Sequence, residues 1–400
     1  MAISHSGTRG KAVERLLIAC VREHDWHQPP PEAASLSQVD QDRLLELANR
    51  HRVAAAVGAS LRGCGDLRAE VRAKLNLASR AVAVRQLLLE SELGRIDSTL
   101  RQVPWLVVKG PALARGYYRR PELRSYVDLD VLVRPTLLHE ALRLLEEKGY
   151  VLLDRNWTLL VQRLSGELHL RSPRGAMIDL HWDLFNDRAT RDSYAMVTDT
   201  FFQRATSLTL AGGLQVQTLD VLDTIVHTAV HAARSGGDRL VWLKDLEQLV
   251  LAGGFSWDEL AERSAQHHAE LAVSVMLHRM RATFGSPEIP DEVLRQIGGR
   301  GSWRVLGRVV DRVAPVTRAG PDGSLTRMFA RATRADGRSA AVELGHRLIA
   351  RARRGGWAEP DHTWDAAHPH SVLYESGGAS AKAAFFDAVG ARRPGVHHSQ

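Results

Sequence analysis

The sequence predicts an α+β fold in which a short segment of alternating strands and helices is flanked by N-terminal and C-terminal helical regions. Apolar residues recur at helical spacing over residues 10–100 and again over 218–284. Between residues 103 and 184, short runs alternate apolar and polar side chains, which is typical of strands. We therefore predict four parts: a helical region (1–100), an α/β core (101–186), a helical domain (187–310), and a basic helical segment with a poorly ordered tail (311–400).

The N-terminal region contains three stretches with helical periodicity. They cover residues 12–22, 41–48 and 71–100, and the prolines at 29–31 separate the first from the second. The core then begins with an apolar strand at 105–109 that stops at Gly110, where Pro111 suits the first position of a helix. Free N–H groups at such a helix start suit phosphate, and Gly110 allows a close approach.

The next strand carries two carboxylates. In residues 125–133, Asp128 and Asp130 point to one face of the strand. The opposite face carries the apolar side chains of Val127, Leu129, Val131 and Val133. Two such side chains stand roughly 6.6 Å apart along a strand, so both can converge on one divalent cation. The sequence thus predicts a metal site on a buried strand.

A third carboxylate lies on a later strand at 175–184. Asp179, His181 and Asp183 share one face there, opposite Ile178 and Leu180. Asp179 could instead form a salt bridge with Arg171 or Arg174, and His181 and Asp183 are expected to hydrogen-bond within the structure.

The order strand, glycine turn, helix, Asp-x-Asp strand and later Asp strand resembles the nucleotidyltransferase superfamily that includes DNA polymerase β. The phrases VVKGPALARGYY, LRSYVDLDVLV, MIDLHWDL and HTAVHAARSGGDRLVWLKDLEQL resemble a bacterial family of uncharacterised nucleotidyltransferases, over residues 103–249. The resemblance implies a small mixed-sheet nucleotidyltransferase core. One departure is Gly110-Pro111, where the superfamily usually has Gly-Gly or Gly-Ser.

The resemblance implies a metal-dependent transfer of a nucleoside monophosphate from a nucleoside triphosphate (NTP) to a hydroxyl of a small molecule, protein or RNA, with release of pyrophosphate. Asp128 and Asp130 would hold the nucleotide-bound Mg²⁺ or Mn²⁺ and help to hold a second ion. Asp179 would complete the second site and act as the base. Lys109, Gly110 and Arg124 would bind the phosphates.

Two other functions fit the same residues. Asp-x-Asp pairs also hold the metal of sugar nucleotides in glycosyltransferases, and a catalytically silent nucleotide-binding or scaffold protein could keep the fold. His227 and His231 are spaced i, i+4 on a predicted helix, a spacing that can bind zinc. We expect them instead to line a helix interface or the nucleotide cleft and to hydrogen-bond Asp245.

Composition limits the compartment and the partners. Two cysteines, Cys20 and Cys64, cannot form a disulfide framework, and no run of 18 apolar residues is present, so we expect a soluble, cytoplasmic protein.

The chain has a formal net charge of +7. Residues 327–354 carry eight arginines and two carboxylates, with Arg327, Arg331, Arg334 and Arg338 at helical spacing. This predicts a basic stripe for nucleic acid or an acidic partner, or else a solvated helix face. Residues beyond Gly356 are expected to be poorly ordered.

Overall fold

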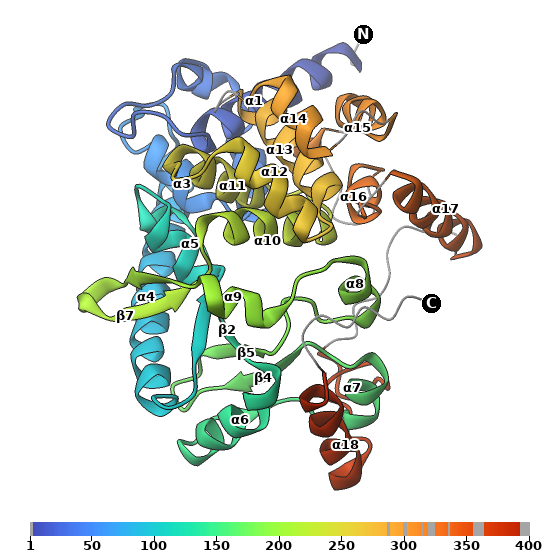
Figure 1. Cartoon of the computed structure of the whole chain (residues 1–400). Coiled ribbons are helices and arrows are strands. Elements are labelled where there is room, and N and C mark those ends of the chain that lie inside the picture. Colours follow the sequence, from blue (N-terminus) through green and yellow to red (C-terminus); the bar gives the residue numbers. More distant parts are fainter. Residues whose placement is uncertain are drawn as a thin grey trace. The chain divides into compact units, whose positions relative to one another are not determined.

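The computed structural model describes residues 3–285, 289–298, 302–313, 315–318, 325–334, 337–354 and 364–392. The chain forms two compact units, each assembled from three separate segments (Figure 1). Unit 1 comprises Met1–Arg85, Tyr117–Ser125 and Ile225–Ala358, and unit 2 comprises Gln86–Gly116, Tyr126–Thr224 and Glu359–Gln400. The boundaries of the four regions predicted from the sequence are not tested and stay a prediction.

Unit 2 is built on a seven-stranded mixed sheet, in the order β3-β4-β5-β2-β1-β7-β6. β2 is parallel to β5 and β1 is parallel to β7, whereas the other neighbours are antiparallel. This sheet and the helices around it confirm the predicted α+β class. The strands are β1 (Trp105–Val108), β2 (Asp128–Val133), β3 (Val151–Leu152), β4 (Glu167–Arg171), β5 (Met177–His181), β6 (Thr206–Thr209) and β7 (Gln215–Thr218).

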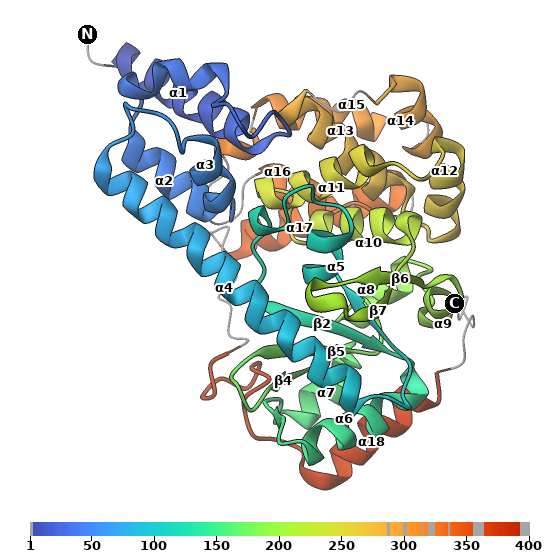
Figure 2. The same cartoon turned by 90° about the vertical axis from the view of Figure 1, so that its left-hand side faces the viewer.

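The core of unit 2 forms on the apolar face of its central strands. Leu129 and Val131 of β2 and Ile178 of β5 join a buried cluster with the second half of α4 (Ala69–Thr99), α6 (Leu138–Glu147) and α7 (Trp157–Arg163). In Figure 1 and Figure 2, both α6 and α7 lie below β2 and β5. The other helices of the unit are α5 (Gly110–Gly116), α8 (Arg188–Ser193), α9 (Thr198–Arg204) and α18 (Gly378–Gly390).

The C-terminal part contains an ordered helix where a poorly ordered tail was expected. Phe385 and Phe386 of α18 belong to the unit 2 core, and both rings lie 5.9 Å from the ring of Trp157 on α7. The prediction is wrong for residues 364–392, because two adjacent phenylalanines supply an apolar anchor despite the Gly- and Ala-rich composition. Residues 355–363 and 393–400 of that prediction lie outside the described residues.

Unit 1 is helical, and its central helix, α13 (Glu270–Phe284), is buried on most of its surface. It packs against α1, α11, α12, α14, α15 and α16. The helices predicted at 12–22, 41–48 and 71–100 correspond to α1, α2 and α4, and this part of the prediction is confirmed. The remaining helices of unit 1 are α1 (Ile3–Val21), α2 (Gln41–Arg50), α3 (Ala54–Ser60), α10 (Val221–Arg234, from Ile225 on), α11 (Leu240–Ala252), α12 (Trp257–Gln266), α14 (Asp291–Gly298), α15 (Ser302–Val313), α16 (Leu325–Arg331) and α17 (Gly337–Arg354).

The basic segment does not form the single stripe predicted from its spacing. Its first helix, α16, ends at Arg331, and α17 begins at Gly337. Arg327 forms an ion pair with Asp238 at 3.3 Å, Arg331 donates to a backbone carbonyl, and Arg334 pairs with a carboxylate of α17 at 3.1 Å. The prediction of a continuous four-arginine stripe is therefore wrong, because the helix is interrupted and three of the arginines bond within unit 1.

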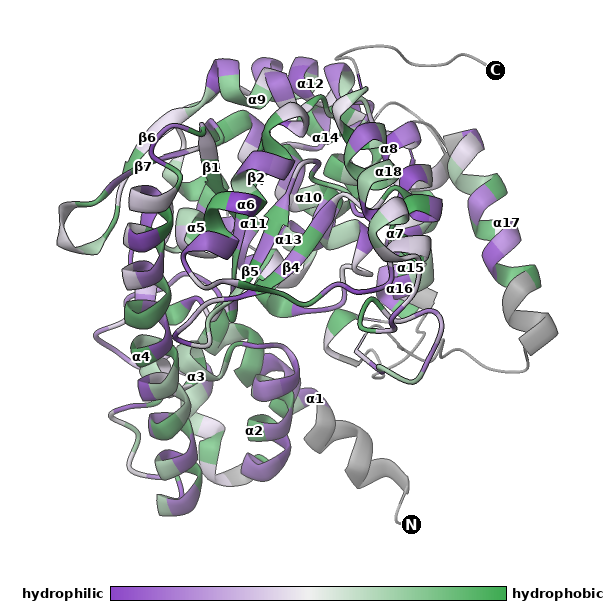
Figure 3. Cartoon of the chain, turned by 90° about the horizontal axis from the view of Figure 1, so that it is seen from below, coloured by the Kyte–Doolittle hydropathy of each residue, from purple (hydrophilic) through white to green (hydrophobic). Residues whose placement is uncertain are grey.

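The helices mix hydrophilic and hydrophobic residues along their length (Figure 3). Within the part of the chain that the structure describes, no helix combines the length and apolar character needed to cross a bilayer. Cys20 and Cys64 are both free thiols. Burial raises the pKa of the Cys20 thiol above its usual range, which keeps it protonated and unreactive.

Candidate metal-binding active site

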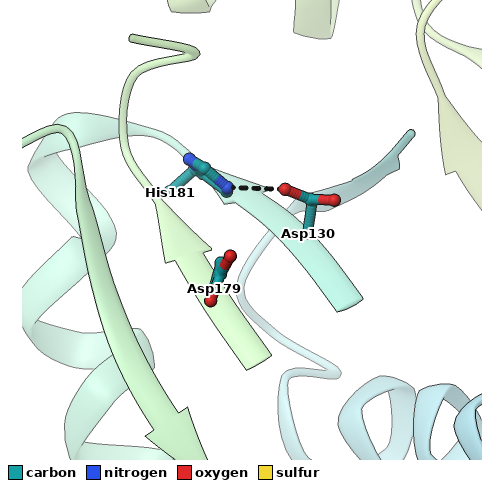
Figure 4. A group of neighbouring side chains, drawn as sticks. All are labelled: Asp130, Asp179 and His181. Atoms are coloured by element: carbon teal, nitrogen blue, oxygen red, sulfur yellow. Dashed lines mark hydrogen bonds and ion pairs between the residues drawn. The ribbon is translucent and has the colours of Figure 1, made fainter. Parts of the chain in front are cut away.

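The strongest cluster of chemically active side chains in unit 2 lies on the polar face of β2 and β5. Asp130 of β2 and Asp179 of β5 are direct neighbours in the register of these parallel strands, and His181 follows two positions after Asp179. Figure 4 shows the three side chains together. Each offers one ligand atom, and these atoms all lie within 4.8 Å of one another. The expected meeting of carboxylates from two strands is therefore present for Asp130 and Asp179.

Asp130 is buried and has two nitrogen neighbours. Lys109 Nζ donates to Asp130 Oδ1 at 2.5 Å, and His181 Nε2 lies 3.0 Å from the same oxygen. Burial alone would raise the pKa of Asp130, but the Lys109 ammonium and the His181 ring outweigh it and hold the pKa far below its usual range. Asp130 is thus ionised at neutral pH, with a cation already beside it.

Asp179 is half-buried and lies among other acids. Burial, together with the carboxylates of Asp130 and Glu167, raises the pKa of Asp179 to about 7. Among the described residues no ion pair joins Asp179 to Arg171 or Arg174, and the charges that shift its pKa are those of Asp130, Glu167, His181 and His169, so that alternative is wrong. A divalent cation would relieve this crowding of like charges, and the donor set therefore fits a metal ion.

A chain of buried and half-buried acids and histidines extends from the cluster to β4. His181 Nδ1 lies 3.3 Å from Glu167 Oε2, and His169 Nε2 lies 3.6 Å from Glu167 Oε1. His169 Nδ1 in turn lies 3.0 Å from Asp154 Oδ1. Burial lowers the pKa of His169, but Asp154 and Glu167 outweigh it and raise the pKa to about 11.

The sequence analysis missed Glu167, His169 and Asp154. The alternation Glu167-Leu-His169-Leu on one strand was the available signal, since it matches the polar–apolar alternation of the 177–181 strand. Strand pairing places Glu167 opposite His181 and His169 opposite Asp179. This register could not be read from the sequence alone, because a loop separates the two strands.

Asp128 begins β2 and is half-buried. Strand alternation gives it the same face as Asp130, and its register partner on β5 is Met177. The group whose ligand atoms lie within 4.8 Å of one another contains His181 in place of Asp128. The role of Asp128 as a metal ligand stays a prediction.

Lys109 and Gly110 occupy the predicted turn between strand and helix. Lys109 follows β1 with φ of +51°, and Gly110 begins α5. A Cβ on Gly110 would lie 3.3 Å from the ring of Tyr126, tighter than ordinary contact, so the site favours glycine. The strand, turn and helix are confirmed. Since α5 has only seven residues, phosphate binding by Gly110 stays a prediction.

Arg124 lies in unit 1, not in unit 2 with the aspartates. Its guanidinium is buried and donates two hydrogen bonds to Asp245 of α11, at 2.8 and 3.0 Å, while the Tyr118 hydroxyl donates to the same carboxylate at 2.6 Å. Burial and the Asp245 carboxylate raise the pKa of Tyr118 well above its usual range. Arg124 thus has a structural partner, and its predicted contact with phosphate is untested.

His227 and His231 lie on α10, as predicted, with ring centroids 6.2 Å apart. The ring of His231 also lies 6.3 Å from that of Trp242 on α11, so this pair lines a helix interface. Among the described residues, the metal-capable group of three contains neither histidine. The carboxylate of Asp245 accepts from Tyr118 and Arg124.

A strand, a glycine turn and a short helix, followed by neighbouring aspartates on parallel strands of a mixed sheet, form the arrangement that the sequence resemblance implied for a nucleotidyltransferase core. The family model described as "Uncharacterised nucleotidyltransferase" matches residues 37–285, which is more than half of the chain. The chain belongs to this family, and the resemblance to a family of uncharacterised nucleotidyltransferases is confirmed. Comparison with curated proteins gives no match. Membership supports a general role in nucleotidyl transfer, with an NTP as substrate.

Proposed function

We propose that this protein is a metal-dependent nucleotidyltransferase that moves a nucleoside monophosphate from an NTP onto a hydroxyl acceptor and releases pyrophosphate. The observation that carries the proposal is the pair Asp130 and Asp179, side by side on parallel strands with Lys109 against Asp130. Bound Mg²⁺ or Mn²⁺ would stabilise the entering and leaving oxygens at the α-phosphate. The two carboxylates, with Asp128 at the start of β2, would hold these ions.

Other steps of the reaction need a base and positive charge for the phosphates, and we assign these roles to individual side chains. Asp179, with a pKa of about 7, suits the base that takes the proton of the attacking hydroxyl near neutral pH. Lys109 supplies a positive charge for the triphosphate, and Gly110 leaves room for it at the turn. Arg124 is proposed as a further phosphate ligand, a role that requires it to share its charge with Asp245.

The proposal leaves three acceptor classes: a small molecule, a protein side chain and RNA. For RNA or an acidic protein, residues 327–354 are the proposed contact, and Arg327, Arg331 and Arg334 would have to share their charge with their partners in unit 1. The proposal also leaves the donor open among the four NTPs, of which ATP is one.

The test uses the full chain with each α-labelled NTP, Mg²⁺ or Mn²⁺, and pools of candidate acceptors. We expect metal-dependent transfer of label with release of pyrophosphate, and a loss of at least about 100-fold in Asp130→Asn and Asp179→Asn, since each removes a charge at the reacting centre. Asp192→Asn is the matched control, because Asp192 is exposed on α8 and should leave the rate unchanged.

Two results would replace the proposal with its alternatives. Consumption of sugar nucleotides instead of NTPs would indicate a glycosyltransferase. Metal-dependent NTP binding without turnover of any acceptor would indicate a silent nucleotide-binding or scaffold protein. Equal activity of Asp130→Asn and the native chain would remove the site assignment altogether.

A further inference from the structure

The position of His181 gives the candidate metal site a nitrogen donor. His181 is only 2% exposed, and its Nε2 faces the Asp130 carboxylate at 3.0 Å. In a six-coordinate site with metal–ligand bonds of about 2.1 Å, neighbouring ligand atoms lie about 3 Å apart. The separation of His181 Nε2 and Asp130 Oδ1 thus equals that of two adjacent ligands.

The other ring nitrogen of His181 has a carboxylate close to it. Nδ1 lies 3.3 Å from Glu167 Oε2, although the two atoms do not have the geometry of a hydrogen bond. A small rotation of either side chain would let Nδ1–H donate to this carboxylate, which would fix the tautomer so that Nε2 presents its lone pair to the ion. Glu167 is in turn flanked by His169, which Asp154 holds. The groups behind the ring therefore come from a neighbouring strand and the segment before it, with Glu167 half-buried and Asp154 and His169 buried.

We propose that His181 is a metal ligand together with Asp130 and Asp179, and that this site takes a first-row transition-metal ion such as Mn²⁺ in preference to Mg²⁺. The inference rests on the metal-dependent nucleotidyl transfer proposed above and specifies its cofactor. Mg²⁺ favours oxygen donors and retains water, whereas an imidazole donor favours transition metals. Glu167 is a positioning residue, since it acts through the ring of His181.

The preference follows from the donor set and not from the carboxylates alone. A site made of Asp128, Asp130 and Asp179 would offer oxygen only and would suit Mg²⁺. Replacing the first of these by His181, as the geometry does within 4.8 Å, adds one imidazole to two carboxylates. Loss of His181 should therefore change metal preference as well as affinity.

The test measures Mn²⁺ binding to the nucleotide-free full chain by electron paramagnetic resonance. The native protein should show nitrogen hyperfine coupling to bound Mn²⁺, which an all-oxygen site cannot produce. His181→Ala should abolish the coupling, weaken Mn²⁺ binding by about tenfold or more, and reduce the excess of Mn²⁺ over Mg²⁺ affinity. Glu167→Gln should keep the coupling and weaken binding by about 10–100-fold.

Two controls keep the test independent of folding. His139→Gln changes an exposed histidine of α6 in the same unit and should leave Mn²⁺ binding unchanged. The coupling in the unmodified protein needs no substitution, so it reports ligation even if His181→Ala does not fold. Bound Mn²⁺ without nitrogen coupling in the native chain, or native Mn²⁺ affinity in folded His181→Ala, would overturn the inference.

The result is separable from the proposed function. Nitrogen-coupled Mn²⁺ in a protein that transfers no nucleotide would support the site and contradict the nucleotidyl transfer. Nucleotidyl transfer supported by Mg²⁺, in a protein whose bound Mn²⁺ shows no nitrogen coupling, would support the proposed function and contradict the role of His181 as a metal ligand.

Discussion

Asp130 is the residue on which the other contacts of the site converge. Its Oδ1 atom lies 2.5 Å from Lys109 Nζ and 3.0 Å from His181 Nε2. The side chain of Lys109 is 21% exposed, so it can leave this position, whereas Asp130 and His181 are held in the sheet. Lys109 therefore occupies the place of a cation beside Asp130. A divalent ion would displace its ammonium group from Asp130, and the phosphates of the substrate would then bind that group.

Because of this arrangement, we expect Lys109→Met to strengthen the binding of Mn²⁺ and to weaken the binding of NTP. Without nucleotide, Mn²⁺ should bind about tenfold or more tightly, because the competing ammonium and its charge-assisted hydrogen bond to Asp130 are gone. NTP binding should weaken, because a positive charge beside the phosphates is lost. Titration calorimetry of Mn²⁺ and of a non-hydrolysable NTP analogue measures both.

Lys109→Arg is the matched control, since it retains the cation and should keep the affinity for Mn²⁺ near that of the native chain. Unchanged or weaker Mn²⁺ binding to Lys109→Met would show that Lys109 does not compete for Asp130.

At the scale of elements, the site depends on the register of parallel strands β2 and β5. The sequence alternation correctly assigned Asp130 and Asp179 to polar faces, because one face of each strand carries Leu, Ile and Val that enter the core. The partner of each residue on the next strand could not be predicted, since register depends on turns and packing outside the strand. Glu167 and its contact with His181 were missed for this reason.

A second contact between elements predicts a pH dependence. His51, at the C-terminal cap of α2, accepts the Leu240 N–H through Nδ1 at 3.3 Å, and its carbonyl accepts the Val241 N–H. It thus caps α11, whose own preceding residue supplies no side-chain cap. Burial, and then the nearby Arg50, lowers the pKa of His51 to about 3.

Because the folded pKa lies below the ordinary value of about 6.5, the unfolded chain binds the proton first as the pH falls. The free energy of unfolding should therefore decrease from pH 6.5 towards pH 3, by up to about 1.4 kcal/mol per pH unit from this group. His51→Asn keeps an acceptor near the Nδ1 position and cannot titrate. Urea unfolding at pH 7 and 5.5 should show a smaller loss in His51→Asn, and equal losses in both proteins would contradict this account.

At the scale of the whole molecule, the chain passes repeatedly between the two units. The segment Tyr117–Ser125 belongs to unit 1, although it joins α5 to β2 of unit 2. Tyr118 and Arg124 anchor it to Asp245 of α11. The sequence placed these residues in one continuous core, because local periodicity carries no information on which distant helix a loop contacts. The return of α18 to the unit 2 core escaped prediction for the same reason.

The anchor predicts a specific pattern of stability. Asp245→Asn leaves the buried guanidinium of Arg124 without its counter-charge and should cost about 3–5 kcal/mol of unfolding free energy. The double variant Arg124→Met with Asp245→Leu removes both charges and should cost less than that single change. Denaturant unfolding followed by circular dichroism measures the cycle.

Glu140→Gln serves as the control, because Glu140 pairs with Arg143 on the exposed surface and its loss should leave stability unchanged. A double variant less stable than Asp245→Asn would show that the ion pair is not the anchor of the segment.

The central claim is that Asp130 and Asp179 together hold a divalent cation for nucleotidyl transfer. Anomalous diffraction from crystals of the full chain grown with Mn²⁺ and a non-hydrolysable NTP analogue tests it most directly. The account predicts a manganese peak about 2.1 Å from carboxylate oxygens of both residues, with the phosphates of the analogue beside it. Analogue and manganese bound elsewhere, with Lys109 still bonded to Asp130, would contradict it.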